Sequence, residues 1–292
     1  MGNIFSDLNR TFQAGTVLSK LLFINIGVFL LVRLLGVLFL LFNMGDVPFL
    51  LYLQLPASPE LLLLRPWTLI TYMFTHFDVL HILFNMLWLY WFGGLFLNFL
   101  SEKQLGGLYL LGGLAGAVLF VLSYNIFPYF RDVASFSYLM GASASVMAIV
   151  FAVSFYRKDV EINLLFIGRI KLIYLAIFTL AIDLLAISSD NAGGHIAHIG
   201  GALFGIWFAS RLREGRDVTA PINRLIDWCV GLGKRKPKMR MTYKRPETDY
   251  EYNARKHQEA VDLDAILDKL KRSGYESLSS DEKKQLFDAS RK

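Results

Sequence analysis

Cysteine is almost absent from this 292-residue sequence: Cys229 is the single one, so an intrachain disulfide is excluded. Charge is also scarce, at 18% of residues, against 54% hydrophobic residues and a mean hydropathy of +0.43. This hydropathy is too high for a soluble domain of this size and indicates a polytopic membrane protein with a soluble appendage. The N-terminal stretch lacks a small-residue cleavage site after an apolar core, so we expect no removable signal peptide.

Long apolar segments account for most of the chain. About 20 apolar residues are needed for a helix to cross a bilayer, and six segments are candidates: 21–42, 79–99, 106–127, 138–156, 170–188 and 195–211. The sequence therefore predicts an all-α fold, with a short N-terminus at 1–20 and a bundle of six transmembrane helices over 21–212. An apolar, proline-broken loop at 43–75 is expected to lie partly in the membrane interface.

Basic residues near the ends of the spans predict the orientation, because Lys and Arg accumulate on the cytoplasmic side. With the N-terminus inside, the outer loops hold only Arg65 and Arg131. Both termini are therefore predicted to be cytoplasmic. The second, fourth and sixth spans then all run inward from the outer face, and polar residues near their starts lie about 5–10 Å below that end: His81, Asn85, Ser143 and His198.

The tail carries most of the positive charge, since 20 of the 30 Lys and Arg residues follow residue 210. Residues 213–240 are predicted to form an amphipathic helix with a basic flank that contacts anionic lipid, and no nucleic-acid partner is expected. Residues 241–292 are predicted to be a linker, over 241–255, and a small helical pair. Its first helix ends at Gly274, and Ser279 with Glu282 opens the second. These helices either bind an unidentified protein partner or only cap the chain.

Two polar islands interrupt the apolar spans, at 141–144 and 195–201. A buried hydroxyl or imidazole without a partner is costly, so such groups often mark a functional site. Ser143 can act as a nucleophile, or it can simply bond a carbonyl of its own helix. His198 can likewise be structural or can be the base that a serine nucleophile needs. Gly201 and Gly205 form a G-x-x-x-G pattern that lets another helix approach closely.

A third group precedes and opens the second span. His81 and Asn85 are four residues apart and share a helix face with donors suited to an oxyanion, although they can equally bond loop backbone. A metal or haem site is the rival, because His76 and His195 also lie in these windows. No H-E-x-x-H pattern is present, and neither Asp78 nor Asp183 has ligand spacing, so no metal is predicted. Asp183 can orient His198, but no spacing supports this and it is given no role.

The three motifs together resemble those of the rhomboid intramembrane serine proteases. Residues 76–85 are similar to the family's H-x-x-x-x-H-x-x-x-N, residues 141–143 to its G-x-S, and residues 197–205 to its A-H-x-x-G-x-x-x-G. The resemblance covers about 20–212. It departs from the pattern at Ala144, where many relatives have glycine, and at Met147, where many have an aromatic residue packed on the histidine.

This resemblance implies cleavage of transmembrane protein substrates from the outer face of a membrane, expected to be a bacterial inner membrane, without a cofactor. Ser143 would be the nucleophile and His198 the base, in a dyad without an aspartate. The oxyanion donors would be His81, Asn85 and the Ser143 N–H. Gly201 and Gly205 would pack the sixth span on the fourth, and three residues would surround and support the pair: His76, Met147 and His195.

Two alternatives remain open at this point. A catalytically silent member of the same family would bind membrane clients without cutting them, and Met147 leaves room for it. A transporter with a site at mid-membrane would need polar residues spread along a path through the bilayer. The polar residues here gather near one face, which favours the protease.

Overall fold

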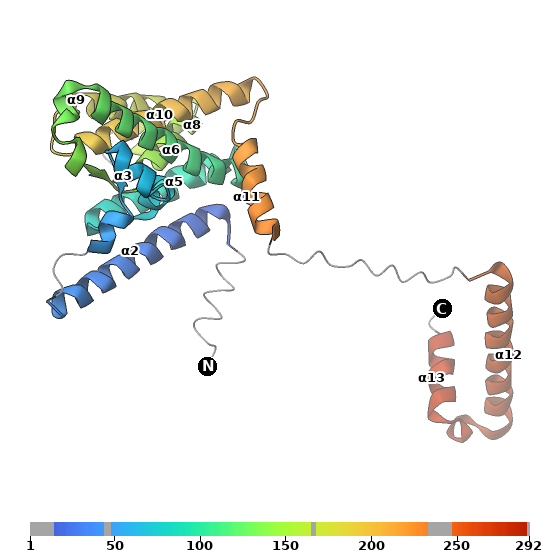
Figure 1. The fold of residues 1–292 in the computed structure, drawn as a ribbon. Coiled ribbons are helices and arrows are strands. Elements are labelled where there is room, and N and C mark those ends of the chain that lie inside the picture. Colours follow the sequence, from blue (N-terminus) through green and yellow to red (C-terminus); the bar gives the residue numbers. More distant parts are fainter. Residues whose placement is uncertain (1–14, 44–47, 165–167, 233–246, 291–292) are drawn as a thin grey trace. The chain divides into compact units, whose positions relative to one another are not determined.

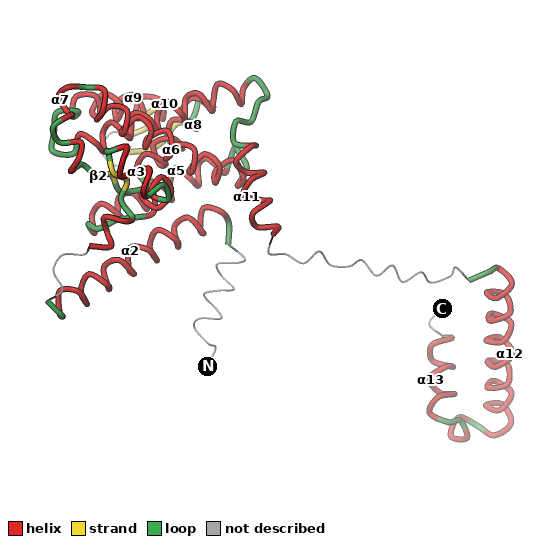
Figure 2. The backbone as a smooth tube through the Cα atoms, in the orientation of Figure 1, coloured by secondary structure: helices red, strands yellow, loops and turns green. Residues whose placement is uncertain are grey.

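The computed structural model describes residues 15–43, 48–164, 168–232 and 247–290. Contacts divide the chain into two compact units, Met1–Lys234 and Arg235–Lys292, and each is described by itself (Figure 1). Helices dominate both units, and the few strands are short (Figure 2). Two parts of the sequence predictions, most of the N-terminal segment 1–20 and the basic flank before residue 241, lie outside the described residues.

Six helices of 14 residues or more build the membrane bundle in the described part of 15–213, which confirms the predicted all-α class. They are α2 (Val17–Leu41), α5 (Val79–Leu97), α6 (Glu102–Ile126), α8 (Ser143–Tyr156), α9 (Leu172–Leu185) and α10 (Ala192–Arg213). Three of them begin at side-chain caps: Thr16 accepts from the Ser19 N–H at 3.3 Å, Asp78 accepts from the His81 N–H at 2.8 Å, and Ser101 forms a capping box with Gln104.

Only α2, α5 and α6 are both long and apolar enough, among the described helices, to cross a membrane by length and composition. The helices α8 and α9 are apolar but shorter, and each begins later than predicted. Residues Tyr138–Leu139 form strand β2, and α9 starts only after a hairpin of β3 (Glu161–Leu164) and β4 (Gly168–Lys171). Fourteen residues give about 21 Å of helix, less than the roughly 30 Å of a hydrocarbon core.

Helix α8 forms the centre of the bundle, with every residue from Ala144 to Ser154 buried. It packs mainly against α10, and also against α6, α5 and α9 (Figure 1). Helix α10 approaches α8 so closely that a Cβ at Gly201 would overlap the Ala144 carbonyl, and a Cβ at Gly205 would overlap the Ala148 carbonyl. The small residues that the sequence placed on this face therefore let two backbones touch.

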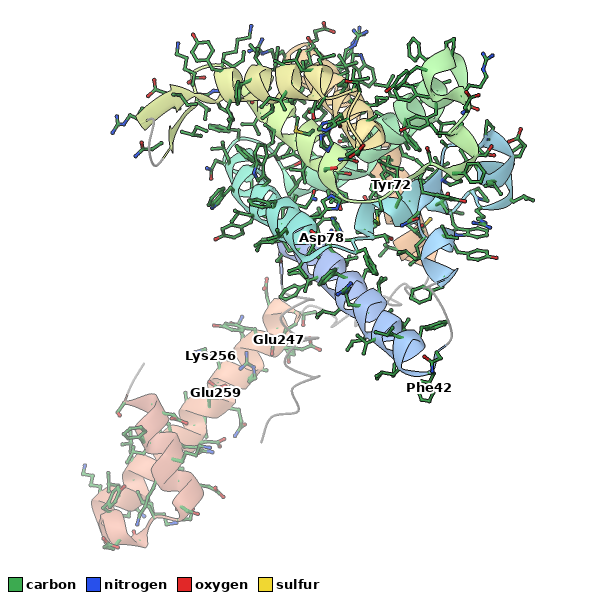
Figure 3. The ribbon with its side chains drawn as sticks, turned by 90° about the vertical axis from the view of Figure 1, so that its left-hand side faces the viewer. Phe42, Tyr72, Asp78, Glu247, Lys256 and Glu259 are labelled. Atoms are coloured by element: carbon green, nitrogen blue, oxygen red, sulfur yellow. The ribbon has the colours of Figure 1, made fainter. Side chains whose placement is uncertain are left out.

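Helix α2 lies against α5 and α6 at the side of the bundle and leaves most of its apolar surface uncovered. Figure 3 shows Phe42 at its end, where the side chain is exposed. Asn25 is the polar exception: it is buried, and its amide donates to the Tyr109 hydroxyl at 3.1 Å. An apolar, exposed helix of this length is suited to a lipid environment.

The loop between α2 and α5 is folded in short pieces rather than extended. It contains η1 (Pro48–Tyr52), β1 (Leu55–Pro56), α3 (Pro59–Leu64), α4 (Thr68–Thr71) and η2 (Tyr72–Phe74). Strand β1 pairs antiparallel with β2, aligning Leu55 with Leu139. The segment between α6 and β2 adds α7 (Pro128–Arg131) and η3 (Ala134–Phe136). The pairing of β1 with β2 ties the loop between α2 and α5 to the residues that precede Ser143.

Helix α11 (Ala220–Leu232) is amphipathic, as predicted from its spacing, and is fastened to α6. Thr219 is fully buried at its start, and Lys103 of α6 forms an ion pair with Asp227 at 2.6 Å. Leu225, Trp228 and Val230 of the same helix are exposed. The helix is thus held to the bundle while several of its apolar side chains remain uncovered.

The second unit is a helical hairpin of α12 (Asp249–Ser273) and α13 (Ser280–Ala289), with η4 (Tyr275–Ser277) between them. Gly274 and the Ser279–Glu282 capping box lie where the sequence predicted them. The predicted linker at 241–255 is wrong beyond Thr248, because a second capping box, of Thr248 with Glu251, starts α12 there. Lys269 bonds Glu282 at 2.9 Å and holds the pKa of that carboxyl below its usual value.

Candidate active site

Ser143 is the first residue of α8, presented by a sharp turn. Gly141 has φ +119°, a conformation that L side chains rarely adopt, and a Cβ there would also meet the His81 ring. The Gly141 N–H donates to the Tyr72 carbonyl at 2.9 Å, and the Ala142 N–H donates to His76 Nε2 at 3.2 Å. The hydrogen bonds to Tyr72 and His76 therefore fix the turn, and the Ser143 side chain points away from these two partners.

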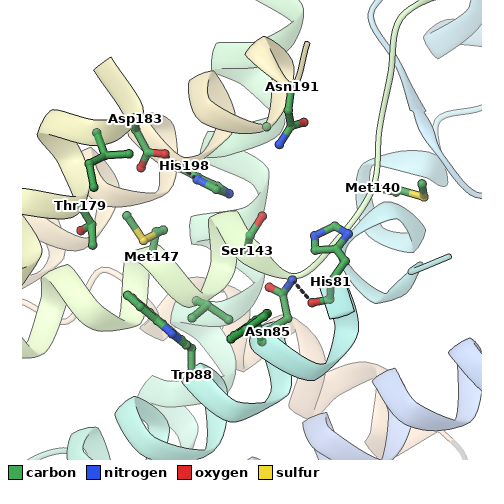
Figure 4. Close-up of a pocket in the computed structure, with 14 residues that line it drawn as sticks. His81, Asn85, Trp88, Met140, Ser143, Met147, Thr179, Asp183, Asn191 and His198 are labelled. Carbon is green, nitrogen blue, oxygen red and sulfur yellow. Dashed lines mark hydrogen bonds and ion pairs between the residues drawn. The ribbon is translucent and has the colours of Figure 1, made fainter. Parts of the chain in front are cut away.

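A cavity of about 330 Å³ brings the sequence-predicted reacting groups together. Ser143 and Met147 of α8, His81 and Asn85 of α5, and His198 of α10 all line it. In the close-up, the Ser143 hydroxyl lies between the His198 ring and the pair formed by His81 and Asn85 (Figure 4). Residues up to 117 positions apart in the sequence, from His81 to His198, thus share one site.

His198 is held by a carboxylate. Its Nδ1 lies 2.9 Å from Asp183 Oδ1, and the Asp183 side chain is only 7% exposed. A carboxylate accepts a hydrogen bond from Nδ1–H, so in the neutral ring Nε2, the other nitrogen, has no hydrogen and is free to act as an acceptor. No spacing in the sequence assigns Asp183 a role in the site. A signal was present: Asp183 closes one apolar helix and His198 opens the next, so an antiparallel pair of helices places them opposite each other.

His195, one turn before His198, contacts the same carboxylate oxygen, with its Nδ1 2.8 Å from Asp183 Oδ1. His76 supports the turn before Ser143 and does not line the cavity, whereas Met147 does. The three residues expected to surround the pair therefore occupy different places. His76 lies beneath Ser143, Met147 lies beside it, and His195 lies behind His198.

Several donors lie near the serine. No side chain caps α8 at Ala142, so the first backbone N–H groups of this helix remain available to a ligand. The Asn85 amide donates to the His81 carbonyl at 2.9 Å, which orients it on the cavity wall and leaves its second hydrogen available. The arrangement fits the stabilisation of a negatively charged oxygen next to Ser143.

Among the described residues, no hydrogen bond joins the Ser143 hydroxyl to His198. Catalytic hydrogen bonds are often long or poorly aligned without a substrate and tighten only in the substrate complex. The geometry thus supplies a serine, an imidazole with a defined free nitrogen and oxyanion donors around one cavity.

The model of the Rhomboid domain matches residues 64–214, which is more than half of the chain. The chain belongs to the rhomboid family. The resemblance noted in the sequence is thereby confirmed, and the apolar helices make this rhomboid an integral membrane protein. The matched range contains every residue of the cavity.

Three curated relatives are similar to parts of this chain. RHOMBOID-like protein 12, mitochondrial, of Arabidopsis thaliana is 32% identical over 162 residues, covering 52% of this chain and 48% of that protein. Presenilin-associated rhomboid-like protein, mitochondrial, of Homo sapiens is 34% identical over 168 residues, or 53% and 39%. Rhomboid protease GlpG of Klebsiella pneumoniae is 35% identical over 94 residues, or 32% and 29%. The chain therefore spans less than half the length of these relatives.

The rhomboid's second unit matches a separate model. Residues 247–292 correspond to DUF6576, a family of unknown function. This range begins one residue before the cap of α12 and extends past the end of α13. The hairpin is thus a recognised module, but the match assigns it no chemistry.

Proposed function

We propose that this rhomboid is an intramembrane serine endopeptidase that uses Ser143 as its nucleophile and His198 as its general base. The family contains proteases, as the name of the Klebsiella relative states. The observation that carries the proposal is the shared cavity, in which Ser143 faces an imidazole whose Nδ1 is bound by Asp183. A serine hydroxyl becomes an effective nucleophile only beside such a base.

The reaction follows from these positions. His198 Nε2 takes the hydroxyl proton as Ser143 Oγ attacks the substrate carbonyl, and a tetrahedral intermediate forms. The negatively charged oxygen is stabilised by the Ser143 N–H, His81 and Asn85. The imidazolium then gives its proton to the leaving amine, which leaves an acyl-enzyme. Water, deprotonated by His198, releases the acid and regenerates the serine.

Asp183 extends the expected dyad as a positioning residue. It fixes the tautomer of His198 and stabilises the imidazolium that forms during the reaction, as the aspartate of a serine-protease triad does. The resemblance implied a base without a carboxylate partner. The 2.9 Å contact is the reason to give this chain a third member.

The substrates we propose are transmembrane segments of other proteins. A helix as short as α8 that reaches one membrane surface ends before the other, so Ser143 at its start lies below that second surface. Polar groups at such depth are tolerated around a wet cavity. By the distribution of basic residues, the cavity opens to the outer face and both termini are cytoplasmic. That the membrane is a bacterial inner membrane is part of this proposal and rests on the family resemblance alone. The exposed face of α11 rests on anionic lipid, and α12–α13 bind an unidentified protein.

Cleavage of a single-span reporter by the purified chain in liposomes tests the proposal. Ser143→Ala and His198→Ala are each expected to abolish cleavage and labelling by a fluorophosphonate probe. Ser145→Ala is the matched control: it removes a serine hydroxyl two residues away that is buried and has no partner in the structure. Its cleavage rate is expected to equal that of the wild type.

Two outcomes would reject the proposal. Equal rates for the wild type, Ser143→Ala and His198→Ala would show that another group cuts the reporter. A folded wild type that neither cleaves the reporter nor reacts with the probe would identify a catalytically silent member of the family.

A further inference from the structure

The site contains one more imidazole than the proposed reaction uses. Asp183 Oδ1 lies 2.8 Å from His195 Nδ1 and 2.9 Å from His198 Nδ1, so two rings share one carboxylate oxygen. Orienting the base requires only the second contact. His195 therefore needs an explanation that the reaction does not supply.

The three side chains form a compact group of ligand atoms. One ligand atom from each of Asp183, His195 and His198 lies within 4.8 Å of the others. Asp183 comes from α9, while the two histidines are one turn apart on α10 and their rings stand edge-on, at 81° with centroids 5.9 Å apart. Their side chains are 7%, 20% and 21% exposed, which leaves the group shielded but reachable.

Two imidazoles and one carboxylate are a ligand set typical of zinc and of neighbouring late first-row cations. We propose that Asp183, His195 and His198 bind a divalent cation of this class, and that its binding switches the protease off. This inference rests on the proposed function for its inhibitory part, but the binding itself does not. A tetrahedral zinc site with bonds of about 2.0–2.1 Å separates its ligand atoms by about 3.3 Å. The distances from Asp183 Oδ1 to His195 Nδ1 and His198 Nδ1, 2.8 and 2.9 Å, therefore need to widen by only about half an ångström.

The cavity provides the route to this site. Asp183 and His198 both line it, together with Asn191 and Gly194 at the start of α10. A cation arriving through the cavity meets the carboxylate and the imidazole directly, and water from the cavity supplies the remaining ligand. The same opening that admits substrate and water thus admits the ion.

Inhibition follows from the proton that a neutral imidazole carries. A neutral ring has one N–H, and a metal ion on Nδ1 forces this hydrogen onto Nε2. Nε2 of His198 is then a donor and cannot accept the proton of Ser143. No net proton is gained or lost, because the hydrogen moves between the two nitrogens of the ring through solvent. Binding of the cation and action as a base therefore exclude each other at His198.

Binding is tested without activity in the full-length Ser143→Ala protein. Cobalt(II) absorption and competition with a zinc indicator are expected to report one equivalent bound per chain. Adding His195→Gln or Asp183→Asn is expected to weaken binding by more than about 10- to 100-fold, which is the loss typical of removing even a residue that only supports a metal ligand. His257→Gln, which removes an exposed imidazole of α12, is the matched control and is expected to leave affinity unchanged.

Inhibition is tested by zinc titration of the reporter assay in otherwise wild-type protein. Zinc is expected to stop cleavage, EDTA to restore it, and His195→Gln to raise the half-inhibitory zinc concentration by about 10- to 100-fold, relative to that variant's own metal-free rate. Binding that is absent, or equal in the wild type and His195→Gln backgrounds, would overturn the site. One bound equivalent without loss of cleavage would overturn the switch. A protein that binds zinc but never cleaves would instead reject the proposed function alone.

Discussion

Two helices of equal length and similar apolar content have opposite environments in this bundle. In α8, all residues from Ala144 to Ser154 are buried, whereas in α9 only Leu172, Ala176 and Asp183 are. Helix α8 carries Ser143, the proposed nucleophile, on a backbone held from several sides. Helix α9 carries the carboxylate on a stripe that packs against α10 and α8, with the rest of its surface free. Hydropathy alone does not separate these two roles, because lipid-facing and core-facing apolar residues read alike.

Among substitutions that test how tightly α8 is held, the largest effect is expected where α8 and α10 approach each other most closely. Gly201→Val places side-chain atoms in the Ala144 carbonyl, which cannot rotate away because it belongs to a helix backbone. We expect a loss of stability above about 3 kcal/mol and no active protein. Thermal unfolding in detergent measures it. Gly94→Ala of α5 is the control, because its Cβ would meet nothing within 4 Å, and helix propensity predicts a gain of up to about 1 kcal/mol. An unchanged melting temperature for Gly201→Val would refute the close approach.

In the proposed reaction, helix α9 contributes through Asp183. Asp183→Asn is expected to lower kcat by about 10²–10⁴-fold with little change in KM, because the wrong tautomer of His198 becomes favoured. Fluorophosphonate labelling of Ser143 should slow by a similar factor. A merely structural role would instead lower the melting temperature and leave the kcat of the folded fraction intact. That result would return the site to a dyad.

The apolar positions of the two helices are expected to differ in energy as they do in burial. Ile149 of α8 is fully buried, whereas Leu185 of α9 is 84% exposed. Truncating Ile149 to alanine is expected to cost about 2–5 kcal/mol, while Leu185→Ala is expected to cost less than about 0.5 kcal/mol. Unfolding in detergent, compared under identical conditions, measures both. Similar losses at the two sites would mean that α9 is covered by contacts outside this single chain.

Much of this arrangement was predictable from local signals. Apolar runs located the six helices, and antiparallel alternation placed His81, Asn85, Ser143 and His198 at one depth, where they now line one cavity. Such patterns suffice because a bilayer restricts spanning segments to a few topologies.

The features that the sequence did not predict depend on pairings between distant residues. Residues 138–142 are apolar enough to continue a helix, but Leu139 pairs with Leu55 and holds this stretch extended, so α8 begins only at Ser143. Asp183 has no fixed spacing to the histidines, and only the antiparallel order of α9 and α10 indicates that it lies opposite them. The early start of α12 differs in kind: the Thr248–Glu251 capping box is a local signal that was present and not used.

The smallest predicted effect has the opposite sign in the two helices: a substitution in the buried α8 stabilises the protein, whereas one in the exposed α9 destabilises it. Ser145 of the central helix has a buried hydroxyl without a partner, facing Gly113 of α6, whereas Thr179 of the outer helix donates to the Ala176 carbonyl at 2.8 Å. Ser145→Ala removes an unsatisfied polar group with little change in volume and is expected to stabilise the protein by up to about 1 kcal/mol. Thr179→Val loses a satisfied hydrogen bond and is expected to destabilise it by about 0.5–1.5 kcal/mol. Paired melting curves decide the sign. A destabilising Ser145→Ala would mean that this hydroxyl has a partner in the membrane, such as a buried water bound between α8 and α6.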